Sequence, residues 1–317
     1  MYRIAMHVDA DGFAAAGVVY KHLREQGVPQ DQMVFHPINY GMPIPEEIDY
    51  EKDTVYLVDF SLQPLMEMVQ FANTLGERLI WIDHHSTSVD MEEEHPALKS
   101  VPGVRQVNWE EGVPISGCEL AWKYLFMDTK MPHILRLIGD WDTWRWKDLP
   151  VYAQEQVKEL QSALYMAENS PKTEEGREFW RSHLVEESDF FETTTFRDGK
   201  LLHAYQEKQW KGQVGALHFE ADFQGLRAIM VNLKGNSEMF KGFYDPEKHD
   251  VMITFQLTKG EYLTVGLYGE NPEIHVGELA RKIGEAGDKP SGGGHAGAAG
   301  FQCSWDYFKT LYEVKES

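Results

Sequence analysis

Cysteine is scarce in this 317-residue sequence, which contains only Cys118 and Cys303 and has no C-x-x-C pair. Two isolated cysteines exclude a disulfide framework and a thiolate zinc site, so the sequence predicts a reducing compartment.

Basic residues are also few. The chain has 30 Lys and Arg against 51 Asp and Glu, a formal net charge of −21. Proteins hold long nucleic acids through many Lys and Arg contacts to phosphates, so this charge argues against a long duplex as a partner. A phosphate-bearing partner should be small, or held through metal ions.

Long apolar runs are absent as well. No run approaches the roughly 20 residues needed to span a bilayer. The N-terminus, MYRIAMHVDADG, reaches an acidic residue at position 9 and lacks the basic and apolar segments of a secretory signal. The sequence therefore predicts a soluble, cytoplasmic protein that binds no membrane. Its hydrophobic content of 42% is enough for two cores.

Short apolar runs alternate with longer amphipathic runs through the first half of the chain. Because the short runs are rich in Val, Ile and Leu, the pattern predicts an α/β fold with a largely parallel sheet and helices on both faces. The expected strands are 2–8, 33–38, 54–60, 78–82 and 104–108, and the expected helices are 14–26, 64–73, 116–127 and 132–139.

The pattern changes near residue 150 and again near residue 212. Residues 151–212 are helical and strongly charged, which indicates a helical linker between two lobes or, equally, extra helices of the first domain. Residues 213–317 predict a smaller C-terminal α/β domain. Its expected strands are 214–220, 226–232, 251–257 and 262–268, and its expected helices are 237–243, 275–285 and 305–314.

A first cluster of polar residues, His7-x-Asp9-x-Asp11-Gly12, follows the first strand. In an extended chain, residues i, i+2 and i+4 point to the same side, so one imidazole and two carboxylates are delivered together. A calcium loop does not fit, because Val18 would stand where the bidentate Glu belongs. A solvated acidic turn is the alternative.

Two further strands also end in polar residues. Asp59 closes the apolar strand in LVDFS, where it is either a ligand or a cap of the next turn. The strand in LIWIDHHS runs into Asp83, His84 and His85. Adjacent residues of an extended chain face opposite ways, so one histidine can bind a metal while its neighbour faces a substrate oxygen.

The segment RLIGDWDTW places two carboxylates at the end of an apolar helix, and we expect Asp140 to be a ligand and Asp142 a supporting residue. The donors are then all oxygen or imidazole, which favours manganese or magnesium over structural zinc. With Asp59 as a bridge they suffice for two metals about 3.5–4 Å apart, the arrangement of many phosphoryl-transfer hydrolases. The six expected donors are His7, Asp9, Asp11, Asp59, His84 and Asp140.

A glycine-rich segment, SGGGHAGAAGF, spans residues 291–301. It lacks the Lys-Ser/Thr ending of a nucleotide-triphosphate loop and does not fit G-x-G-x-x-G. Its glycines can turn backbone N–H groups toward an anion, and His295 adds a donor. A flexible loop before a tightly packed element is the alternative.

In this order, the clusters resemble those of the DHH phosphoesterase family, in its RecJ-like and nanoRNase-like members with a DHH-associated C-terminal domain. The resemblance extends over nearly the whole chain. It implies a bilobal protein with a DHH catalytic domain at 1–150, a helical linker at 151–212 and a substrate-binding domain at 213–317, with the active site in the cleft between lobes. The matching residues are the H-x-D-x-D-G motif at 7–12, Asp59, Asp83-His84-His85, Asp140 and Gly292-Gly-Gly-His295.

The resemblance also implies roles for these residues. One metal ion would bind His7, Asp9 and Asp59, and a second would bind Asp11, Asp59, His84 and Asp140. The ions are expected to be manganese, with magnesium or cobalt as alternatives. His85 would contact the scissile phosphate and Asp83 would support it, so the catalytic group is Asp59, Asp83 and His85. The backbone of Gly292, Gly293 and Gly294, together with His295, would grip a substrate phosphate.

The chain departs from the family pattern in two places. Residues 13–17, Phe-Ala-Ala-Ala-Gly, are apolar where many members have a further polar residue. The strand 263–268 lacks the Arg with which many members hold a substrate phosphate, and Arg227 or Lys234 would replace it only if the fold brings them near.

These features predict a manganese-dependent phosphodiesterase that hydrolyses short single-stranded oligonucleotides to nucleoside 5′-monophosphates. The net charge favours a nanoRNase over a processive nuclease. The alternatives are a phosphomonoesterase for 3′-phosphoadenosine 5′-phosphate, a cyclic dinucleotide phosphodiesterase and, in another class, a nucleotide sensor without turnover. The number of associated chains stays open, a homodimer being one option.

Overall fold

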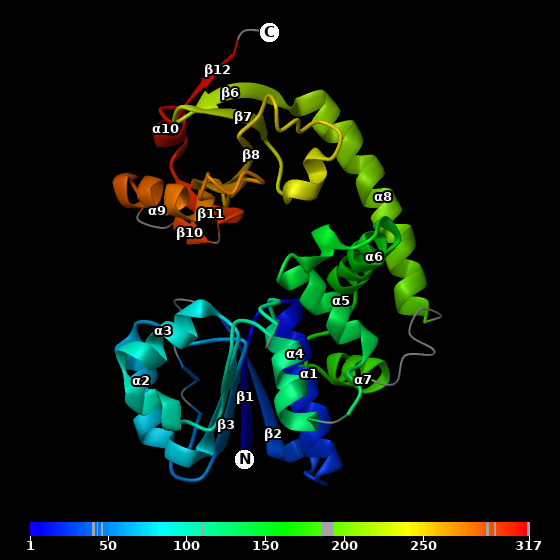
Figure 1. The fold of residues 1–317 in the computed structure, drawn as a ribbon, viewed down its shortest axis with the longest axis vertical. Helices are drawn as coiled ribbons and strands as arrows, with labels where there is room; N and C mark the ends of the chain where they lie inside the picture. Colours follow the sequence, from blue (N-terminus) through cyan, green and yellow to red (C-terminus); the bar gives the residue numbers. More distant parts are fainter. Residues whose placement is uncertain are drawn as a thin grey trace. The chain divides into compact units, whose positions relative to one another are not determined.

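The computed structural model describes residues 1–317 except 40, 41, 43, 46, 110, 128, 185–192, 290, 291, 295, 316 and 317. The chain forms two compact units, Met1–His203 and Ala204–Ser317 (Figure 1). The division falls inside helix α8 (Thr194–Leu217), whereas the sequence suggests boundaries near 150 and 212. Helices beyond residue 150 contribute Val157, Leu160 and Trp180 to the core of the first unit, as in the alternative that the sequence left open, extra helices of the first domain.

The first unit is built on a five-stranded parallel sheet in the order β2-β1-β3-β4-β5 (Figure 1). This confirms the predicted α/β class. The strands are β1 (Tyr2–His7), β2 (Met33–Ile38), β3 (Thr54–Val58), β4 (Leu79–Asp83) and β5 (Gly103–Arg105).

Helices cover both faces of this sheet, so alternate strand residues enter two different cores. Ile4 and Met6 belong to the core on the α1 side, whereas Leu57 and Trp81 belong to the core on the α2 side. Burial on both faces explains the continuous apolar runs of the strands. The first side is covered by α1 (Ala10–Glu25), α4 (Gly117–Phe126), α5 (His133–Asp142), α6 (Val151–Met166) and α7 (Glu174–His183), and the second by α2 (Leu65–Leu75) and α3 (Ser86–Glu94).

An ion pair anchors the start of β1. Arg3 Nε lies 2.7 Å from Asp53 Oδ2, and the amine of Met1 lies 3.0 Å from Asp53 Oδ1. Burial of Asp53 favours its neutral form, but the hydrogen bond from Arg3 and the Met1 amine outweigh it and lower the pKa of Asp53 to about 2.

We expect Asp53→Asn to lower the free energy of unfolding by about 2 kcal/mol at pH 7, because one pKa unit corresponds to about 1.4 kcal/mol. The folded-state pKa lies below the unfolded value, so this stabilisation exists above about pH 4 and disappears as the pH falls toward 2. Urea denaturation at pH 7 and pH 2.5 measures it. Asp31→Asn, at an exposed position, is the control, and an equal deficit at both pH values would contradict the assignment.

The second unit is a seven-stranded mixed sheet in the order β10-β11-β9-β8-β7-β6-β12. Strands β7 and β8 pair in parallel, and the other described pairs are antiparallel. Helices α9 (Val276–Ala286) and α10 (Trp305–Phe308) pack on one face, and α8 with the short helix η6 (Ser237–Phe240) packs on the other. The strands are β6 (Phe219–Phe223), β7 (Leu226–Val231), β8 (Val251–Thr258), β9 (Tyr262–Tyr268), β10 (Gly292–Gly294), β11 (Ala298–Cys303) and β12 (Tyr312–Val314).

Three predictions for this unit were wrong. The expected strand 214–220 is helical up to Leu217, because Val214 is buried against Phe240 and the end of α8 packs there. The expected helix 305–314 stops early, and β12 joins the edge strand β6. The glycine-rich segment is not a loop over Gly292–Gly294 but the edge strand β10.

Among the helices of the described residues, none is both long enough and apolar enough to cross a membrane.

Candidate metal centre

The polar clusters meet at the carboxyl ends of the strands of the parallel sheet. Strand β2 lies on one side of β1 and β3 lies on the other, so the strand order reverses between β1 and β3. Open parallel sheets bind ligands beyond the carboxyl ends of their strands at such a point. His7 ends β1, Asp59 follows β3 and Asp83 ends β4, so three strands deliver polar residues to this end of the sheet.

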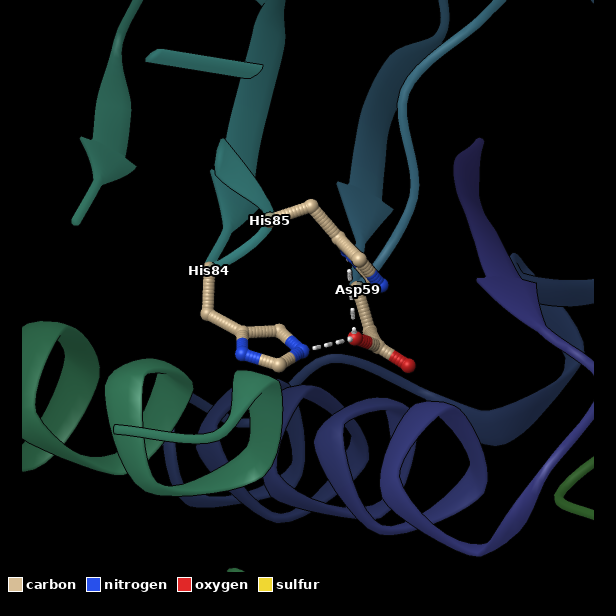
Figure 2. A group of neighbouring side chains, drawn as sticks. All are labelled: Asp59, His84 and His85. Atoms are coloured by element: carbon tan, nitrogen blue, oxygen red, sulfur yellow. Dashed lines mark ion pairs between the residues drawn. The ribbon is translucent and has the colours of Figure 1, made fainter. Parts of the chain in front are cut away.

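Asp59 occupies the middle of the cluster. Figure 2 shows His84 and His85, at the end of β4, reaching toward its carboxylate. Oδ1 of Asp59 lies 3.2 Å from His84 Nε2, and its Oδ2 lies 3.8 Å from His7 Nδ1. The backbone of Asp59 has a φ of 53°, a left-handed conformation that is uncommon for a residue with a side chain and that concentrates at functional sites. One carboxylate thus faces two different groups of side chains.

Each of these groups has the composition of a metal site. In each, three potential ligand atoms lie within 4.8 Å of one another. A third set, Asp59 with His84 and His85, shares Asp59 with the first group and His84 with the second. The first group is His7, Asp9 and Asp59, and the second is Asp11, His84 and Asp142.

Asp9 also begins the first helix. Its Oδ1 accepts a hydrogen bond from Gly12 N at 2.8 Å, which caps α1, and its Oδ2 lies 2.5 Å from His7 Nδ1. A Cβ at position 12 would lie 2.4 Å from the carbonyl oxygen of His7. The glycine of the motif is therefore required by the close approach of the helix to β1.

Asp11 is held by the start of another helix. The backbone N–H groups of Gly117 and Cys118 donate to its two oxygens at 2.6 and 2.9 Å. These donors lie in the first turn of α4, whose positive end stabilises a carboxylate. A Cβ on Gly117 would lie 2.7 Å from Asp59 Oδ1. Gly117 is not among the residues expected from the sequence, although the capping pattern beginning at Ser116 marks this helix start.

The structure places Asp142, rather than the predicted Asp140, in the cluster. Residues two apart on a helix are separated by about 200°, so only one of the two can face the site. Asp142 Oδ2 lies 3.5 Å from His84 Nε2, whereas Asp140 Oδ1 accepts a hydrogen bond from Arg145 Nε at 2.8 Å. Asp142 is therefore the candidate metal ligand at the end of α5.

Arg145 connects Asp140 to α4. Its Nη1 and Nη2 atoms donate to the two carboxylate oxygens of Glu119 at 2.9 and 2.8 Å. Glu119 also accepts a hydrogen bond from the backbone N–H of Ser116, the residue that caps α4. The network thus joins the end of α5, which carries Asp142, to the helix start that holds Asp11.

His85 is oriented by Asp83. The fully buried Asp83 carboxylate contacts His85 Nδ1 at 2.7 Å and accepts a hydrogen bond from the backbone N–H of His85 at 3.2 Å. Burial lowers the pKa of His85, but the hydrogen bond and charge of Asp83 outweigh this and raise it above its usual value. The contact leaves Nε2 as the ring nitrogen for a substrate atom.

The chemistry of Asp59 fits a site for cations. The side chain is only 1% exposed, and neither oxygen accepts a hydrogen bond from any residue that the structure describes. Burial and the nearby charges of Asp11 and Asp9 raise the pKa of Asp59 well above its usual value. A buried carboxylate without donors and beside other carboxylates is stabilised by a bound cation. Imidazole and carboxylate donors together suit divalent ions such as manganese, magnesium or cobalt.

The glycine-rich segment lies in the second unit. A Cβ on Gly292 would lie 2.2 Å from the carbonyl oxygen of Ala280 in α9, and one on Gly294 would lie 2.6 Å from Ala299 Cα. These glycines are therefore needed for close packing of β10. His295 lies outside the described residues, and its role stays a prediction.

Arg227 does not replace the arginine that is missing from β9. It lies on β7, four strands from β10 in the sheet, which corresponds to about 19 Å. Its guanidinium forms an ion pair with Asp250 at 2.7 Å.

Part of the chain matches a known protein family. Residues 2–138 match the family model described as DHH family, N-terminal domain. No curated protein matches the sequence.

Similar folds occur among solved structures. The DHH-domain structure of a member of a family of ribosomal proteins is 15% identical, with a TM-score of 0.62 over 98% of this chain and 84% of that chain. The pGpG-specific phosphodiesterase PggH from Vibrio cholerae is 13% identical, with a TM-score of 0.49 over 98% and 96% of the two chains. RecJ in complex with Mn²⁺ from Thermus thermophilus is 15% identical, with a TM-score of 0.48 over 98% and 50%. The first of these likenesses shows a shared fold.

Proposed function

We propose that the protein is a metal-dependent phosphodiesterase that hydrolyses short oligonucleotides to nucleoside 5′-monophosphates, because residues 2–138 match the family model described as DHH family, N-terminal domain. Two divalent ions, with manganese preferred, would be held by His7, Asp9 and Asp59 and by Asp11, Asp59, His84 and Asp142. The observation that carries this proposal is the placement of Asp59, whose two oxygens face two separate groups of potential ligands.

The bound ions would supply Lewis acidity for the attacking water and for the phosphate oxygens. The chain itself supplies positioning. Asp59 would set the spacing of the two sites, and the N–H groups at the start of α4 hold Asp11 in place. His85, oriented by Asp83, would donate from Nε2 to a non-bridging phosphate oxygen and stabilise the charge that develops there.

Charge supports a short substrate. A net charge of −21 repels a long nucleic acid, whereas a substrate of two to five nucleotides brings few negative charges to the site. In the second unit, β10 lies at the edge of the sheet, and its backbone N–H groups are candidates for binding a phosphate.

Product analysis with metal-stripped protein tests this function. The protein is reloaded with manganese, magnesium or cobalt and given labelled RNA of two to five nucleotides, a longer single-stranded DNA, 3′-phosphoadenosine 5′-phosphate and cyclic di-AMP. We expect stepwise release of nucleoside 5′-monophosphates, with the highest rate in manganese. The rate should be highest for the shortest RNA, because a short RNA brings few phosphates to the acidic surface.

Other products would change the assignment. Phosphate released from 3′-phosphoadenosine 5′-phosphate alone would indicate a phosphomonoesterase. Nucleotide binding without turnover on any of the four substrates would contradict an enzymatic role and favour a sensor.

A further inference from the structure

A pocket of about 610 Å³ lies within the second unit, between α8 and the segment around η6. This volume falls in the range of roughly 300–1,000 Å³ that is usual for small-molecule sites. All of its lining residues lie between positions 204 and 243, so none of the ligands proposed for the metal centre described above contributes to it.

The two walls of the pocket are fixed to each other. Helix α8 supplies Glu207, Lys208 and Lys211, which share one helical face. Beyond the pocket, Val214 of the same helix is buried against Met239 in a shared core. Across the pocket, Lys241 Nζ lies 2.8 Å from Glu207 Oε1. The cavity is therefore a feature of packed elements, not of a surface loop.

Two aromatic side chains contribute to the pocket. Trp210 and Phe243 are partly buried, and both pack against the core that contains Met239, which is 1% exposed. An aromatic ring that is held by a core on one side and partly exposed on the other offers a stacking surface for a flat ring. Stacking of a nucleobase on such a surface contributes strongly to binding in many nucleic-acid proteins.

The pocket is also basic in an acidic protein. Three of its ten lining residues are lysines and two, Glu207 and Glu238, are glutamates, a net charge of +1, whereas the whole chain carries −21. Lys241 is paired with Glu207. Lys208 and Lys211 are exposed, and neither forms an ion pair with a carboxylate of the described residues. Two ammonium groups one helical turn apart are suited to a phosphate.

We propose that this pocket binds a nucleotide, with its base against Trp210 and Phe243 and its phosphate on Lys208 and Lys211. A purely apolar ligand would leave the lysines unused, and a sugar phosphate would leave the aromatic rings unused. Such a site is distinct from the metal centre and needs no hydrolysis, so it does not depend on the proposed function.

Calorimetric titration of the full-length, metal-stripped protein in EDTA tests the proposal. AMP is compared with ribose 5-phosphate, which lacks the base. We expect AMP to bind about tenfold more tightly, and Trp210→Leu to remove most of this difference. The double variant Lys208→Glu, Lys211→Glu should weaken AMP binding at least tenfold.

A matched control has the same change of charge. Lys259 and Lys315 are exposed residues of the same unit that do not line the pocket, so Lys259→Glu, Lys315→Glu should alter AMP affinity less than twofold. Circular dichroism establishes that each variant is folded. Equal weakening by both double variants, equal affinity for AMP and ribose 5-phosphate, or no saturable binding of AMP would overturn the proposal.

Discussion

Replacing Asp59 with Asn should lower kcat on a dinucleotide by about a thousandfold or more, with metal-loaded protein. The amide keeps the shape of the side chain but removes its charge and leaves a single acceptor oxygen. Because the two oxygens of Asp59 face His84 and His7, both metal groups lose a ligand at once. Calorimetry with Mn²⁺ should show fewer than two bound ions per chain.

The same substitution should not unfold the metal-free protein. The Asp59 carboxylate is buried beside Asp11 and accepts no hydrogen bond from the described residues, so its charge opposes folding when no cation is bound. In EDTA, the melting temperature of Asp59→Asn should equal or exceed that of the unchanged protein. Asp31→Asn, on the surface, is the control. Two bound ions and an unchanged kcat in Asp59→Asn would contradict the bridging role.

The second prediction distinguishes the roles of two neighbouring carboxylates, Asp140 and Asp142. Asp142→Asn should lower kcat by about a hundredfold or more, because Asp142 lies beside His84 in the second group. Asp140→Asn should lower it by less than about tenfold, because Arg145 remains bonded to both oxygens of Glu119 when Asp140 is neutral. Steady-state rates and Mn²⁺ titrations of the two variants measure the difference.

These two variants control for each other, since both convert Asp to Asn within three residues at the end of α5. A larger loss for Asp140→Asn than for Asp142→Asn would mean that the metal-loaded protein uses the residue expected from sequence. Equal, small losses of kcat in the two variants would indicate that neither carboxylate at the end of α5 binds a metal ion.

Local sequence was sufficient for most elements of the first unit. Its strands are short runs of Val, Ile and Leu that are buried on both faces, so their positions are visible in the sequence. The prediction failed where packing at a distance decides the outcome. Val214 could begin a strand by its local pattern, but burial against Phe240 keeps α8 helical to Leu217. Tyr312 and its neighbours form β12 because the edge of β6 is available for pairing.

For the site, sequence alone was enough to predict the type of donor atom and most of the residues that the structure brings together. His7, Asp9, Asp59 and His84 lie at or just beyond the ends of parallel strands, and Asp11 lies in the first turn of α1 directly after β1, so the geometry of the sheet brings them together. Asp142 and Gly117 lie on helices instead. Which face of a helix meets the sheet depends on rotation about the helix axis, and that rotation is set by contacts such as Arg145 with Glu119 and the close approach of Gly139 to the same side chain. The choice between Asp140 and Asp142 depends on tertiary packing, because the local sequence does not show which of two opposite helix faces points toward the site.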